Sequence, residues 1–102
     1  MAEIDLTVYI FVHRSKRPSA SVYSNYFSFT LYGWHPIREE LVFLDTCVTN
    51  SGGAKLYPTF DGAVYEARSC VRKELDEVIR FMELDVTQDD ITLSYAPFVL
   101  FN

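Results

Sequence analysis

Residues 4–13 read Ile-Asp-Leu-Thr-Val-Tyr-Ile-Phe-Val-His, and aliphatic side chains occupy every second position. A period of two with several β-branched residues predicts a strand that presents one face to a core. The aliphatic face consists of Ile4, Leu6, Val8, Ile10 and Val12. The opposite face also carries rings, Tyr9 and Phe11, so we expect it to be partly covered as well.

The next stretch, residues 14–21, is polar and contains a proline, which predicts a loop at the tip of a long hairpin. Residues 22–33 then form a second strand that ends at Gly33, Trp34, His35 and Pro36. One face of this strand is apolar and suits a core: Tyr23, Phe27, Phe29 and Leu31. Its other face is rich in hydroxyl groups: Val22, Ser24, Tyr26, Ser28, Thr30 and Tyr32.

A third strand is predicted over residues 38–49, where apolar side chains on both faces suggest a central place in the sheet. Residues 50–53, Asn-Ser-Gly-Gly, predict a turn, and a short fourth strand is expected over residues 54–57. The last strand covers residues 91–101. Pro97 cannot donate a ladder hydrogen bond, so this strand should be an edge or contain a bulge.

One helix is predicted over residues 60–84, because apolar side chains recur there at intervals of three and four. They are Val64, Ala67, Val71, Leu75, Val78 and Met82. Thr59 or Asp61 should cap its start, and Asp76 and Arg80 have the spacing of an ion pair. The element order predicts a single α+β domain, residues 1–102, with one antiparallel sheet and one amphipathic helix packed on one face.

The chain has 102 residues and a formal net charge of −5. All of that excess lies in residues 61–102, which hold nine acidic and four basic side chains. An acidic chain is repelled by nucleic acid and by anionic membranes, so we expect a basic protein surface as the partner. The chain has neither a signal-like start nor an apolar run of membrane length, and we expect a cytoplasmic protein.

Catalytic and metal-binding patterns are weak in this sequence, and we expect no enzyme, cofactor or metal site. A cysteine nucleophile needs an imidazole beside it, and nothing in the sequence brings Cys47 or Cys70 to His13 or His35. We expect both cysteines to be reduced thiols of the core. Residues 85–90 are acidic but lack the glycine of an EF-hand, and Thr87 with Asp90 fits a capped turn instead.

The favoured hypothesis is therefore a small inhibitor or adaptor that occludes a basic surface of a larger, nucleic-acid-handling protein. Its acidic contacts would be Asp76, Glu77, Glu83, Asp85, Asp89 and Asp90, and its aromatic anchors Tyr26, Tyr32 and Trp34. In size, acidity and lack of a catalytic set, the chain resembles bacterial immunity proteins and phage-encoded inhibitors as a class. No residue carries over from that resemblance.

Two other hypotheses use different residues. A single-stranded RNA-binding module would use Arg14, Lys16 and Arg17 together with Tyr26 and Tyr32, although the acidic charge makes nucleic acid the less favoured partner. A homodimer could form through the apolar residues 91–101 and is compatible with the favoured hypothesis.

Overall fold

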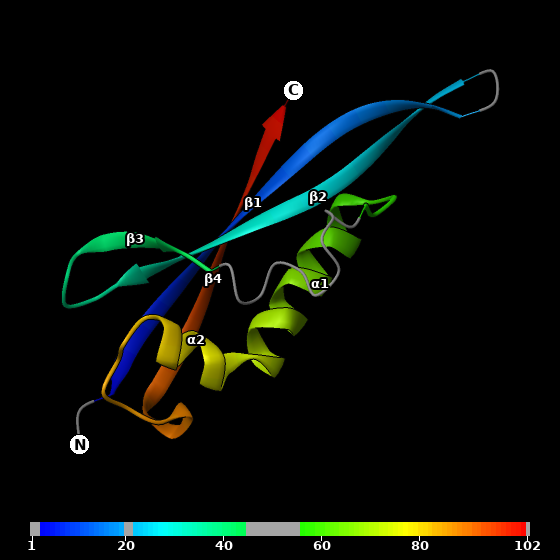
Figure 1. Ribbon diagram of the computed structural model, residues 1–102. Helices are drawn as coiled ribbons and strands as arrows, with labels where there is room; N and C mark the ends of the chain where they lie inside the picture. Colours follow the sequence, from blue (N-terminus) through cyan, green and yellow to red (C-terminus); the bar gives the residue numbers. More distant parts are fainter. Residues whose placement is uncertain (1–2, 20–21, 45–55, 102) are drawn as a thin grey trace.

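A four-stranded sheet with helices on one face makes up the described part of the chain, residues 3–19, 22–44 and 56–101 of a computed structural model (Figure 1). The elements are β1 (Ile4–Ser19), β2 (Val22–His35), β3 (Glu40–Phe43), α1 (Phe60–Lys73), α2 (Leu75–Phe81), the 3-10 turn η2 (Gln88–Asp90) and β4 (Ile91–Phe101). The predicted α+β class, with one sheet and helical structure packed on one face of it, is confirmed, although two helices take the place of the one predicted.

The sheet is mixed, so the prediction of a purely antiparallel sheet is wrong. Its strand order is β3-β2-β1-β4, in which β2 is antiparallel to β1 and β3, whereas β4 is parallel to β1. The helices carry the chain from the end of β3 back to the end of the sheet where β1 starts (Figure 1). From there β4 can only run beside β1 in the same direction, and Ile4 pairs with Ile91.

The β1–β2 hairpin is longer than predicted and projects past the helices (Figure 1). Residues 14–19 belong to β1, not to a loop, and Ser19 pairs with Val22. β2 likewise continues through Gly33 to His35. A glycine suits this point of the strand because a Cβ atom there would lie 3.0 Å from Met82 Sδ.

The two sheet edges are β3 and β4. The edge position predicted for the last strand is confirmed. The central position predicted for residues 38–49 is wrong for their described part, residues 38–44, and residues 45–49 lie outside the described part of the chain. β3 covers only Glu40–Phe43, and the apolar side chains of Leu41 and Phe43 are exposed instead of lying inside the sheet. The predicted turn at residues 50–53 and the first half of the short fourth strand predicted over residues 54–57 lie outside the described residues; in the second half, Tyr57 forms an isolated bridge with Phe27.

The core lies between the sheet and the helices. Leu6, Val8, Ile10 and Val12 are fully buried, and every member of the predicted helical stripe is buried against them. The single predicted helix is wrong in one respect, since it is interrupted at Glu74. The predicted cap is confirmed: the Thr59 hydroxyl oxygen accepts the Gly62 N–H at 3.0 Å. The predicted Asp76–Arg80 ion pair is wrong, since Arg80 pairs with Glu77.

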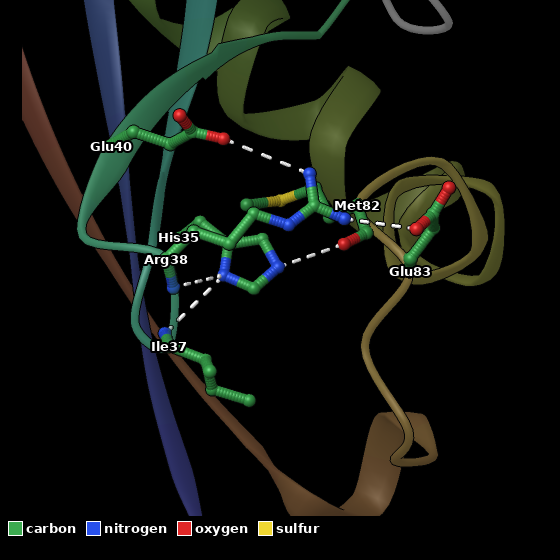
Figure 2. A network of polar contacts seen from close by, with 6 residues as sticks. All are labelled: His35, Ile37, Arg38, Glu40, Met82 and Glu83. Carbon is green, nitrogen blue, oxygen red and sulfur yellow. Dashed lines mark hydrogen bonds and ion pairs between the residues drawn. The ribbon is translucent and has the colours of Figure 1, made fainter.

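Hydrogen bonds of a buried histidine, His35, connect the β2–β3 turn to the end of α2 (Figure 2). His35 is only 2% exposed, in contrast to the turn position that the sequence suggested. Its Nδ1 accepts the backbone N–H groups of Ile37 and Arg38 at 3.3 and 3.1 Å. Nε2 therefore carries the ring proton and donates it to the Met82 carbonyl oxygen at 2.9 Å. Next to the His35–Met82 hydrogen bond, the Arg38 guanidinium forms ion pairs with Glu40 and Glu83, and all three side chains are exposed.

Candidate functional site: an uncovered aromatic face of the sheet

The face of the sheet that points away from the helices is uncovered by any described element, and we call it the open face. Strand alternation and pairing place the following side chains on it: Thr7, Tyr9, Phe11 and His13 of β1; Tyr26, Ser28, Thr30, Tyr32 and Trp34 of β2; Leu41 and Phe43 of β3; and Thr92, Ser94, Ala96 and Phe98 of β4. None of these side chains is buried. Among the described residues, the expected partial cover comes from neighbouring rings: Phe98 stacks on Tyr9 and on Phe11, and Tyr32 meets Phe11.

A row of rings crosses all four strands of the open face. Phe98 of β4 stacks on Phe11 of β1 with ring centres 5.5 Å apart. Phe11 meets Tyr32 of β2 edge to face at 5.4 Å, and Tyr32 meets Phe43 of β3 at 5.5 Å. The register explains this row, because Phe11 pairs with Phe98 and Tyr32 pairs with Phe43.

The surface along this row is apolar to an unusual degree for an exposed sheet. Leu41 is 48% and Phe98 46% exposed, and Trp34 and Phe43 are similarly open to solvent. At these exposures the four side chains present roughly 350 Å² of apolar area, which is within the range of the largest patches on monomers and is often functional.

A pocket of about 450 Å³ opens in the middle of this face, lined by Phe11, His13, Thr30, Tyr32 and Leu41. His13 Nε2 lies 3.1 Å from the Thr30 hydroxyl at one side of the pocket. Apolar walls with a few fixed polar groups are typical of a binding pocket. Such a pocket can take a large apolar side chain and satisfy one polar atom of it.

The same pocket offers little for nucleophilic chemistry. The His13–Thr30 contact pairs a hydroxyl with an imidazole, but no carboxylate lines the pocket as the third group that would orient the ring. Cys70 packs against the core on the helical side, so the sheet separates its thiol from His13. His35 donates to the Met82 carbonyl, and Cys47 lies outside the described residues. Within the described residues, no group of His, Cys, Asp and Glu side chains could hold a metal ion.

The six predicted acidic contacts gather at one end of the molecule. Asp76 and Glu77 lie on α2, Glu83 and Asp85 follow it, and Asp89 and Asp90 belong to η2. Three of them have internal partners. Glu77 pairs with Arg80 and Glu83 with Arg38, while Asp90 accepts the Thr87 N–H at 3.4 Å, as the predicted cap requires. For Asp76, Asp85 and Asp89, no ion pair is formed with another described residue.

The predicted aromatic anchors and acidic contacts lie on different sides of the fold. Tyr26, Tyr32 and Trp34 are all on the open face, where Tyr26 sits opposite Ser15. The acidic residues lie on the helical side and at the end where β1 and β4 begin. Among the described acidic residues, exposed Asp5 at that end of β1 brings a negative charge onto the open face, where it pairs with Thr92, whereas Glu40 of β3 pairs with His35 on the helical side.

The predicted basic loop is part of the hairpin strands. Arg14 is half-buried opposite Phe27 on the helical side of the sheet, and Lys16 is exposed farther along β1. The Arg17 backbone continues β1, but its side chain is outside the described part of the structure. Among its described side chains, the open face therefore carries no lysine or arginine.

Sequence reasoning missed Phe11, Leu41, Phe43 and Phe98 as site residues. The alternation of β1 placed Phe11 on the face opposite the aliphatic one, so the sequence did contain a signal that could have identified Phe11 as a residue of the site. The other three depend on which strands flank β1 and β2, and sequence periodicity does not encode strand order.

Comparisons with known proteins add nothing to this geometry: no protein family matches the chain, and neither a curated protein nor a solved structure is similar to it. Within the described residues, no helix combines the length and the apolar character needed to cross a membrane.

Proposed function

We propose that this protein is a non-enzymatic protein-binding module, an inhibitor or adaptor of a larger cytoplasmic protein, and that the open face is its contact surface. The single observation that carries the proposal is the uncovered row of rings across all four strands. Burial of apolar surface is the main driving force of protein association, and this face keeps such surface in water.

The size of the open face supports a protein as its occupant. Residues 5–13 of β1 with their neighbouring strands cover about 30 Å by about 15–20 Å, or roughly 500 Å² before side-chain relief is counted. That is of the order of the ~800 Å² of accessible surface that each partner buries in a standard interface. Its aromatic rings and scarcity of charges are typical of an interface core, and the Ser and Thr beside Tyr are typical of adaptable recognition surfaces.

A partner would use the pocket and the acidic end for different purposes. An aromatic or aliphatic side chain of the partner fits the pocket beside Phe11 and Leu41 and supplies most of the affinity. Asp76, Asp85 and Asp89 are exposed and are left to attract a basic surface from a distance. The partner is therefore a protein that has a protruding apolar residue at its contact surface and an overall positive charge.

Single-stranded nucleic acid is a weaker candidate for this face. Phosphates need cations close to the stacked bases, and the described side chains of the face include neither lysine nor arginine. The central rings also pack against one another, with Phe11 and Tyr32 in edge-to-face contact, which leaves less ring surface for a base.

The test compares matched variants. L41Q/F98Q removes apolar surface from the open face, whereas F81Q removes an equally exposed ring from α2 and serves as the control. The wild-type protein and both variants are cross-linked in an extract of the cells that produce the protein. A captured protein is then purified, and its affinity is measured directly. We expect L41Q/F98Q to weaken binding at least ~30-fold and F81Q to leave it unchanged.

A second variant, D76K/D85K/D89K, separates the long-range electrostatic attraction of the partner from its direct contact with the open face. It spares Asp90, which has a structural role, and should lower the association rate and its salt dependence while changing dissociation little. Equal loss of binding in F81Q and L41Q/F98Q would contradict the proposal. So would light scattering that shows a dimer abolished by L41Q/F98Q, since a second copy would then cover the face.

A further inference from the structure

A second pocket, also of about 450 Å³, lies on the outer face of α1, far from the open face. Its walls are Tyr65, Arg68, Ser69, Arg72 and Lys73, and we call it the α1 pocket. Residues 61–102 contain nine acidic and only four basic side chains, yet three of those four bases line this single pocket. None of the five lining residues is acidic, so the most acidic half of the sequence presents a locally positive concave surface.

The three cations of the α1 pocket are available to a ligand. Neither Arg68, Arg72 nor Lys73 forms an ion pair with any other described residue. Arg68 lies over the Tyr95 ring of β4 at 5.4 Å, which holds its guanidinium in place at the wall. Arg68 and Arg72 are one helical turn apart, about 6 Å along the axis. The arrangement can meet successive negative charges along an extended chain.

An exposed ring completes the pocket. Tyr65 is 71% exposed, one turn before Ser69 on the same side of α1. Aromatic rings beside cations are the combination with which proteins bind single-stranded nucleic acids, because the rings stack on bases while the cations meet phosphates. An acidic peptide would use the cations but would leave the ring without a stacking partner.

We propose that the α1 pocket binds a segment of single-stranded nucleic acid, with phosphates on Arg68, Arg72 and Lys73 and one base against Tyr65. This inference is independent of the function proposed for the open face. It also differs from the RNA hypothesis drawn from the sequence, which used residues 14–17 and the sheet. With three cations and a chain of net charge −5, binding is weak, with a dissociation constant of about 10⁻⁴–10⁻⁶ M that rises steeply with salt.

The experiment is fluorescence anisotropy of a labelled oligouridylate of about 12 nucleotides with the full chain at low salt. Three contacts predict a slope of about −2 for log affinity against log salt. R72Q/K73Q should reduce the slope to about −0.7, and Y65A should weaken binding at least about fivefold. The matched control R38Q/R80Q removes two positive charges outside the pocket and should leave the slope unchanged.

Competition identifies what the site recognises. Unlabelled oligouridylate should displace the label, whereas poly-glutamate of equal charge and free adenosine monophosphate should not. The proposal is overturned if the oligonucleotide does not bind at low salt, or if R38Q/R80Q reduces the slope as much as R72Q/K73Q does. Displacement by poly-glutamate would show that the site reads charge alone, and equal affinity for the mononucleotide would make a free nucleotide the ligand; either result refutes the proposal. Circular dichroism confirms that each variant is folded.

Discussion

Replacing His35 with alanine should be among the most damaging single changes outside the apolar core. The substitution removes three hydrogen bonds in a buried position: Nε2–H to the Met82 carbonyl, and the N–H groups of Ile37 and Arg38 to Nδ1. Each such bond contributes about 0.5–1.5 kcal/mol. We therefore expect H35A to lower the free energy of unfolding by about 3 kcal/mol, a large part of the roughly 5–15 kcal/mol typical of a domain.

Urea unfolding followed by far-ultraviolet circular dichroism measures this effect. With a slope of about 1–3 kcal/mol per molar urea, the midpoint should fall by at least ~1 M. The control is R38M, which breaks the exposed ion pairs with Glu40 and Glu83 around the same turn and should cost only about 0.2–1 kcal/mol. If H35A lowers the free energy of unfolding by less than ~1 kcal/mol, or if R38M lowers it equally, the buried His35 ring is not what stabilises the contact between the β2–β3 turn and α2.

Three further predictions concern single positions. Burial raises the pKa of Tyr57 above its ordinary value of 10.0, so its contribution to stability is complete below that pH and is lost as the pH rises through the folded-state pKa. Between about pH 9 and pH 11, wild type should therefore lose more stability in urea titrations than Y57F does. Glu39 is exposed and has a φ of 55, a backbone conformation that glycine adopts without strain. E39G should therefore raise the free energy of unfolding by about 0.5–1 kcal/mol. An unchanged urea midpoint would show that the Glu39 backbone is not strained. G33V places methyl groups against Met82 and should cost about 1–3 kcal/mol in the same assay, whereas an unchanged midpoint would mean that the Met82 side chain moves aside easily.

Much of the fold follows from local patterns that the sequence contains in full. The alternation of residues 4–13 determines which side chains of β1 enter the core, and the intervals of three and four in residues 64–82 determine the buried stripe of the helices. Both are single-element periodicities, and they hold whatever the neighbours are. The Thr59 cap and the Thr87–Asp90 turn are equally local, since each joins residues three apart.

Strand order and direction, by contrast, were decided only by the tertiary structure. Whether β4 runs parallel to β1, and whether β3 lies at an edge, depends on where the helical crossover returns the chain, and side-chain alternation is the same in every case. The row from Phe98 through Phe11 and Tyr32 to Phe43 exists only because that order aligns one ring from each strand. In the same way, the helix–sheet packing buries His35 beside the Met82 carbonyl, 47 residues away in sequence, a contact that no local pattern encodes.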